Sequence, residues 1–164
     1  MNRYPLSEFS ENVYYYNIEE IEASQYEITF ASSTHYLPTN LLDIDIYEIS
    51  FNKIGEFKIP SIEIGQRVQL TISYAIANFI SKMNCPLLFI CDSLDGIERY
   101  RLRRFKSWYD KLEDRDNYTF EVRELYSEAE DFTYYSGLIV QNNHAYFDQI
   151  INEFDSPKIF CEKG

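Results

Sequence analysis

The stretch 68–90 restricts the fold more than any other part of the sequence. Between Val68 and Met83 the apolar residues recur at spacings of three, four and seven, the pattern of a helix that packs along one face. Cys85-Pro86 ends that helix, and Leu87 to Ile90 is a continuous apolar run, typical of a strand buried on both faces. A helix that leads into such a strand predicts a β-α-β unit, in which this strand lies parallel to an earlier one.

Alternating apolar and polar residues predict further strands on both sides of this unit. Before it, the aromatic cluster at 13–16 and the alternating stretch at 26–30 predict two antiparallel strands. In 42–51 the apolar residues alternate at first as 42, 44 and 46 and then as 47, 49 and 51. This shift of one residue inside a strand predicts a bulge within 47–48. After the unit, 118–123 alternates, whereas 133–140 is apolar on both sides and should lie further inside the sheet.

These elements predict a single α+β domain over residues 1–164. Its sheet is expected to be mixed and mostly antiparallel, with one central β-α-β crossover. Helices at about 62–83, 97–113 and 143–155 should cover the sheet. A chain of 164 residues is of ordinary length for one domain and can bury a sizeable core.

The charge of the chain is strongly acidic and unevenly distributed. A net charge of −12 opposes general binding to nucleic acids or anionic membranes, because both need a basic surface. Only the segment 97–115 is basic; its local charge of +3 leaves −15 for the rest of the chain. No stretch approaches the roughly 20 apolar residues of a membrane span, and no signal segment is recognisable at the start, so we expect a cytoplasmic protein.

The basic segment contains a candidate binding site. Arg99, Arg103 and Lys106 recur at spacings of four and three, so they can lie side by side on a helix. Either their stems cover aromatic surface while their charged ends meet nearby acids, or this face binds an anionic ligand or an acidic patch of a partner protein. Under the second interpretation, Arg104 and Trp108 on the same helix also belong to the binding site.

Two residues at the end of the buried strand have a structural and a functional interpretation each. Asp92 lies where open α/β sheets place ligands, yet it also fits a helix cap, with Asp92 to Gly96 as a turn. Cys91 is either a nucleophile with a lowered pKa or a buried structural thiol. Neither the cysteines nor the histidines have the spacing of metal ligands, and we predict no metal site.

The chain resembles a family of small proteins found mainly in Bacteroidetes. The resemblance rests on a combination of motifs, namely 89–96, Arg103 with Phe105, Trp108-Tyr109 and 134–139. That family has no established activity. The resemblance therefore implies a bacterial source and does not point to a reaction.

The string Trp108-Tyr109-Asp110-Lys111-Leu112 is similar to one in the Gcn5-related N-acetyltransferase fold. This resemblance implies an N-acetyltransferase-like order of elements, an acyl-CoA carried by the β-α-β unit, and Tyr109 as general acid. The diphosphate-binding loop of that fold would fall at 62–67, where only Gly65 matches. Glu63 in the same loop would repel an anion.

Two classes of function stay open. The acidic charge, the many tyrosines and the lack of a complete catalytic constellation favour a small regulatory or protein-interaction factor of the antitoxin, immunity or defence-accessory type. Such a factor would bind a protein partner and no nucleic acid. The alternative is an acyl-CoA-dependent N-acyltransferase with a degenerate diphosphate loop. A further alternative is that the acidic surface imitates nucleic acid.

Overall fold

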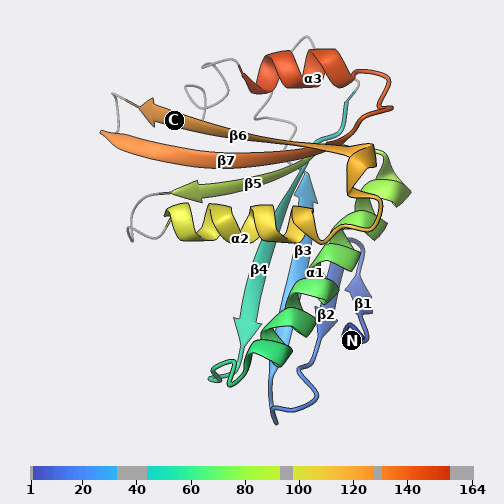
Figure 1. Cartoon of the computed structure of the whole chain (residues 1–164), viewed down its shortest axis with the longest axis vertical. Helices are drawn as coiled ribbons and strands as arrows, with labels where there is room; N and C mark the ends of the chain where they lie inside the picture. Colours follow the sequence, from blue (N-terminus) through green and yellow to red (C-terminus); the bar gives the residue numbers. More distant parts are fainter. Residues whose placement is uncertain (1, 33–43, 93–97, 128–130, 156–164) are drawn as a thin grey trace.

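The computed structural model describes residues 2–32, 44–92, 98–127 and 131–155. Within these ranges, seven strands form one sheet in the order β1-β2-β3-β4-β5-β7-β6 (Figure 1). All neighbouring strands are antiparallel except β4 and β5, which are parallel and are joined through the helix α1. The predicted α+β class, with a mostly antiparallel sheet and one central β-α-β crossover, is confirmed.

The first four strands form one half of the sheet. They are β1 (Ser7–Ser10), β2 (Val13–Tyr16), β3 (Gln25–Ser32) and β4 (Tyr47–Ile54). β2 and β3 are the two early strands that the sequence predicts. β1 was not predicted, because all its residues are exposed and show no apolar alternation.

The other half of the sheet consists of β5 (Leu87–Asp92), β6 (Tyr118–Ser127) and β7 (Phe132–Gln141). β7 lies between β5 and β6, as its two apolar faces predicted. β6 is the edge strand, and its Val122 is 46% exposed.

In the described part of the chain three α-helices cover the sheet: α1 (Ile62–Met83), α2 (Glu98–Asp110) and α3 (Phe147–Phe154). The predicted bounds of α1 are confirmed. α2 ends at Asp110, before the predicted 113, and the amides of Lys111 and Leu112 close turns on the carbonyl oxygens of Trp108 and Tyr109. Asp114, in a left-handed conformation with φ 57°, then precedes a short 3-10 turn. α3 begins later than the predicted 143, since turns closed by the amides of His144 and Phe147 precede it.

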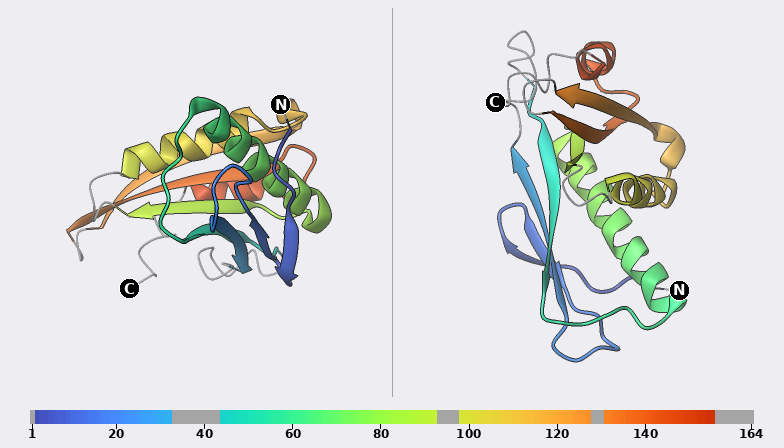
Figure 2. Two further views of the ribbon diagram at one scale, coloured as in Figure 1. Left: turned by 90° about the horizontal axis from the view of Figure 1, so that it is seen from below. Right: turned by 90° about the vertical axis from the view of Figure 1, so that its left-hand side faces the viewer.

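The helices lie on opposite faces of the sheet. α1 and α2 pack on one face, whereas α3 packs on the other face over β5 and β7 (Figure 2). The larger core cluster lies under α1 and α2 and includes Phe79, Phe105 and Trp108. The smaller cluster lies under α3 and includes Leu88 and Leu138. No helix among the described residues has both the length and the apolar character needed to cross a bilayer.

The predicted bulge within 47–48 was wrong. β4 begins at Tyr47 and pairs with β3 in a regular register up to its last residue. Ile44 and Ile46 precede the strand and belong to the cluster under α3, whereas Ile49 belongs to the cluster under α1 and α2. The shift in apolar phase therefore marks the place where the chain changes from one face of the sheet to the other.

Candidate functional site

A groove separates the parallel strands β4 and β5. Their ladder contains only Tyr47–Leu87 and Glu48–Leu88, after which the strands diverge. In Figure 1 the arrowhead of β4 points down and that of β5 points left, so their carboxyl ends lie far apart. Open sheets with a β-α-β crossover commonly bind ligands at the carboxyl ends of such strands.

The divergence leaves two strand edges facing each other without a common ladder. Beyond Glu48, β4 pairs with β3 along 49–54, and beyond Leu88, β5 pairs with β7 along 89–92; no ladder among the described residues joins these two stretches. Strand edges carry peptide N–H and C=O groups that seek partners. An extended molecule with amide groups can supply such partners in the manner of an added strand.

The groove encloses a cavity of about 360 Å³ with largely apolar walls. The wall residues from β4, α1, β5 and α2 include Phe51, Val68, Ile72, Phe89 and Trp108. Consecutive residues of β4 (48–51) and of β5 (89–91) also line it. Because side chains alternate between the two faces of a strand, a cavity that touches consecutive residues passes between the strands from one face of the sheet to the other.

Trp108 forms the aromatic floor at the α2 side of the groove. Its ring lies 4.8 Å from that of Phe51 and 6.1 Å from that of Phe89, so it links the two diverging strands. Its indole N–H is buried and has no acceptor among the described residues. Buried donors nearly always have a partner, and an unpaired one costs about 1–3 kcal/mol.

Two arginines of α2, Arg101 and Arg104, line the groove. The guanidinium of Arg104 lies 5.6 Å from the centre of the Trp108 ring and forms no ion pair with an acid among the described residues. Burial raises the pKa of Tyr26, and the positive charge of Arg104 acts in the opposite direction. Glu48 is the only acid among the described residues of the lining, so the groove carries a positive balance in an acidic protein.

The amino end of α1 does not fit a diphosphate. The segment 62–67, predicted to be the diphosphate loop, is helical. Ser61 is the N-cap of the helix. Its Oγ accepts a hydrogen bond from the amide N–H of Ile64 at 3.3 Å, and its carbonyl oxygen accepts one from the amide N–H of Gly65 at 3.2 Å. A Cβ added to Gly65 would meet no atom closer than 4.0 Å, so no close backbone approach depends on this glycine.

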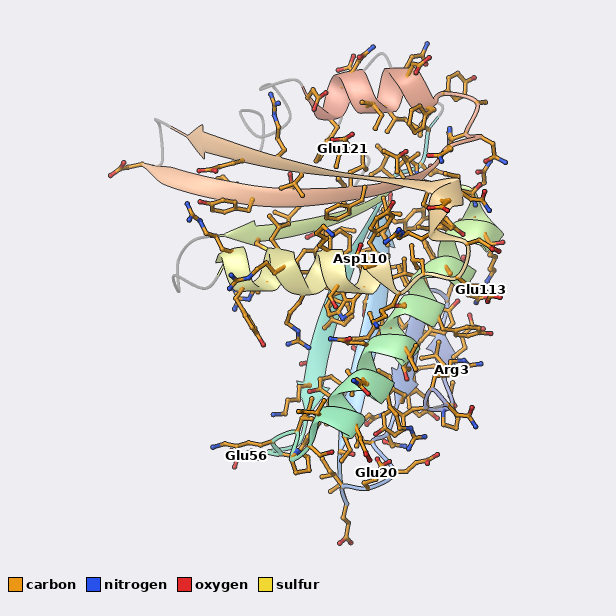
Figure 3. All side chains as sticks on the ribbon, viewed as in Figure 1. Arg3, Glu20, Glu56, Asp110, Glu113 and Glu121 are labelled. Carbon is orange, nitrogen blue, oxygen red and sulfur yellow. The ribbon has the colours of Figure 1, made fainter. Side chains whose placement is uncertain are left out.

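Acidic side chains also lie at this end of the molecule. Glu63 belongs to the first turn of α1, and Figure 3 shows Glu56 in the connection that leads from β4 to α1. Helix amino ends bind anions through free N–H groups and their positive dipole end. At α1 the Ser61 cap already satisfies one of these N–H groups, and the nearby carboxylates repel an anion.

The predicted cationic face of α2 lies on the opposite side of the helix from the groove. Arg99, Arg103 and Lys106 together border a second hollow of about 380 Å³, which we call the outer hollow. Its other lining residues are Leu102, Val122, Glu124 and Tyr135. Lys106 pairs with Asp110 at 2.8 Å, one turn further along α2. The predicted clustering of the three cations is therefore present, around a mostly apolar floor.

The remaining predicted residues lie in different places. The hydroxyl of Tyr109 donates to the carbonyl oxygen of Tyr118 at 3.1 Å and is outside the groove lining, so its role as general acid stays a prediction. Cys91 is 2% exposed and lines the groove. Asp92 ends β5, but its side chain and the predicted turn 93–96 fall outside the described residues. The described residues bring no set of metal ligands together.

The sequence interpretation missed Glu48, Tyr26 and Arg101 as groove residues. One signal was available, because Arg101, Arg104 and Trp108 are spaced by three and four and so share one side of a helix. Nothing local in the sequence indicates that β4 and β5 diverge after two residue pairs. Without that divergence Glu48 and Tyr26 would be ordinary strand residues.

Comparison with known proteins gives a family and one solved structure. The model of a family of unknown function, DUF6169, matches residues 65–156. The structure of MesI, a CoA-dependent acyl-homoserine lactone synthase, is 12% identical, and the alignment covers 90% of this chain and 72% of that one with a TM-score of 0.35. A similarity at this level supports no conclusion about the activity of this chain. No curated protein matches the chain.

Proposed function

We propose, for a chain that belongs to the DUF6169 family of unknown function, that the groove between β4 and β5 binds an acyl thioester and supports transfer of its acyl group to an amine. The observation that carries this proposal is the two-pair ladder between β4 and β5, because it leaves a groove that passes through the sheet. A thioester arm with amide groups can pair with the open strand edges. The apolar walls suit the acyl chain.

Residues from both faces of the sheet border the groove, so the two substrates can approach it from opposite sides. In acyl transfer to an amine, a C–N bond forms, the C–S bond breaks, and a base takes the proton that the amine loses. Glu48 is the carboxylate of the lining and is the last β4 residue paired with β5, at the closed end of the groove. We assign it the role of general base, and the leaving thiolate takes up a proton in turn.

Binding is tested by thermal unfolding with acetyl-CoA, butyryl-CoA and octanoyl-CoA. At a hundredfold excess over its dissociation constant, a ligand stabilises by about 2.7 kcal/mol, which corresponds to a rise in Tm of about 5–10 °C for a domain of this size. Ser50→Trp fills the groove from β4, and Asn52→Trp is its matched control, because Asn52 lies on the same strand and face but not in the lining.

We expect octanoyl-CoA to stabilise the wild type and Asn52→Trp but not Ser50→Trp. The absence of any shift with all three thioesters, or an equal shift in both tryptophan variants, would overturn the proposal.

Transfer is tested by release of free thiol from acetyl-CoA in the presence of primary amines such as lysine and spermidine. Glu48→Gln should lower the rate about a hundredfold or more, which is the usual contribution of a general base, and should leave the thermal shift with octanoyl-CoA unchanged. Thiol release at the wild-type rate by Glu48→Gln would remove Glu48 from the reaction.

A second candidate function, binding of an acidic protein partner, is favoured by the outer hollow. Three cations around an apolar floor suit a partner segment that presents an apolar side chain among carboxylates. This is the regulatory or interaction role expected from the composition. The charge of the rest of the chain would steer such a partner toward α2, because it repels acids elsewhere.

This second candidate is tested by affinity capture from the native host with the wild type, Arg103→Glu and Lys58→Glu. Both sites are exposed, but only Arg103 lies at the outer hollow. A protein captured by the wild type and by Lys58→Glu, and lost with Arg103→Glu or at high salt, supports the role. Equal capture by all three variants contradicts it.

A further inference from the structure

We propose that Arg101 and Arg104 bind a single phosphate on the arm of the thioester, so that the donor is recognised as an acyl phosphopantetheine and not through a nucleotide diphosphate at α1. This inference rests on the proposed function of the groove and specifies its substrate class. Its basis is a contrast between the two helices that follow β4 and β5.

The helix after β4 is poorly suited to an anion. Ser61 caps the amide of Ile64 in its first turn, and Glu63 adds a negative charge there. A diphosphate would need free N–H groups at this point and small residues that let it approach the backbone. Ile62 at the first helical position is instead 81% exposed and apolar.

The helix after β5 offers cations inside the groove itself. α2 starts near the carboxyl end of β5 and runs back toward the start of that strand (Figure 1), where its pairing with β4 closes the groove. A rise of about 1.5 Å per residue places Arg104 about 6 Å and Arg101 about 10 Å further from the closed end than Trp108. An extended arm that enters past these arginines therefore has its acyl end near Trp108 and Glu48.

The surroundings of Arg104 suit a phosphate. Its guanidinium lies over the rings of Trp108 and Tyr100, at 5.6 and 5.9 Å from their centres, and these rings restrict its position. No described acid competes for it in an ion pair. Guanidinium groups bind phosphate through paired N–H donors, which gives both strength and geometry.

The test compares three donors with one acyl chain: octanoyl-pantetheine, octanoyl-phosphopantetheine and octanoyl-CoA. Dissociation constants are measured by calorimetry on the full chain. We expect the phosphate to tighten binding at least tenfold over octanoyl-pantetheine, and the nucleotide of octanoyl-CoA to add less than a further threefold. Raising the salt concentration should weaken binding of the two donors that carry phosphate and leave binding of octanoyl-pantetheine unchanged.

Arg101→Gln and Arg104→Gln should each reduce the effect of the phosphate severalfold, and the double variant should abolish it while octanoyl-pantetheine binds as before. Arg103→Gln is the matched control, because it removes a charge from the same helix on the side of the outer hollow. Unchanged melting temperatures of the free variants show that they fold, as expected for residues that are exposed or half-buried.

The outcomes separate the two proposals. If none of the three donors binds, the proposed function fails. If all three bind alike, or if octanoyl-CoA binds far more tightly than octanoyl-phosphopantetheine, the groove still binds thioesters but the proposed phosphate site is wrong. An equal effect of Arg103→Gln and Arg104→Gln would also overturn the phosphate site.

Discussion

The two halves of the sheet differ in how they are covered. In β1–β4 only the face toward α1 is packed; on the other face Thr29 is half-buried, and Ala31, Ser50 and Asn52 are exposed. In β5 and β7 both faces are packed, one by α2 and one by α3. The first half is therefore a sheet with one open face, and the second is the middle layer of three.

This difference shows what holds the molecule together at the groove. The two halves share only a two-pair ladder, so side chains on α1 and α2 must connect them. Phe51 of β4 packs on Trp108 of α2, and the Ser73 hydroxyl of α1 donates to the carbonyl oxygen of Trp108 at 2.8 Å. The groove can stay open because packing, and not the ladder, joins the halves.

The largest effect is expected from removing one central ring from each half. Phe79 stacks on Phe30 at 4.0 Å and ties α1 to the first half, whereas Phe105 stacks on Phe89 at 4.7 Å and ties α2 to the second. Both are fully buried. Phe79→Ala and Phe105→Ala should each lower the free energy of unfolding by about 3–5 kcal/mol in urea denaturation.

The same experiment tests whether the halves unfold together. A single transition in both variants would show that packing across the groove makes them one cooperative unit. Two separate transitions in either variant would show that the halves are independent, and the interpretation of the α1–α2 contact would have to be abandoned.

A smaller loss is expected for Gly137→Ala on β7. A Cβ at this position would lie 2.5 Å from Cδ1 of Phe105, which cannot move away because its ring is fully buried. Overpacking of this kind costs about 1–3 kcal/mol. Gly65→Ala in α1 is the control: its Cβ has room, and the change should stabilise the helix by up to about 1 kcal/mol. Equal effects of the two changes would contradict the close packing of α2 on β7.

The hydrogen bond between the two helices should contribute less. Ser73→Ala removes the donor to Trp108 and should lower the free energy of unfolding by about 1–2 kcal/mol, measured by urea denaturation. Ser81→Ala, at an exposed site on the same helix, should change it by less than about 0.5 kcal/mol. A loss no larger than that of the control would show that the α1–α2 contact does not depend on this bond.

The smallest effect concerns pH. Burial lowers the pKa of His144, and its Nδ1 accepts the amide N–H of Tyr146 at 3.1 Å, as a neutral ring does. In the unfolded chain the pKa of a histidine is about 6.5, so the unfolded state binds the proton first as the pH falls. The free energy of unfolding therefore decreases as the pH falls below about 6.5. His144→Gln should flatten this part of the stability profile between pH 7 and 5; an unchanged slope would contradict the assignment.

Much of the fold was predictable because it depends on local patterns. The bounds of α1 followed from apolar residues such as Val68 and Ile72 at helical spacing, and the central place of β7 followed from its two apolar faces. β1 was missed because a short, exposed edge strand has no such pattern. The side-by-side placement of Arg99, Arg103 and Lys106 was also predictable, since helical spacing alone decides it.

Local patterns in the sequence thus predict the helices, the strands other than β1, the faces that these elements bury and the charge of α2. Long-range packing decides that β4 and β5 diverge after Glu48 and Leu88, and that Arg101 and Arg104 line the resulting groove while Arg99, Arg103 and Lys106 do not. The physical reason is that strand divergence depends on sheet twist and on helices packed from distant parts of the chain. Those contacts leave no periodic trace in the residues that line the groove.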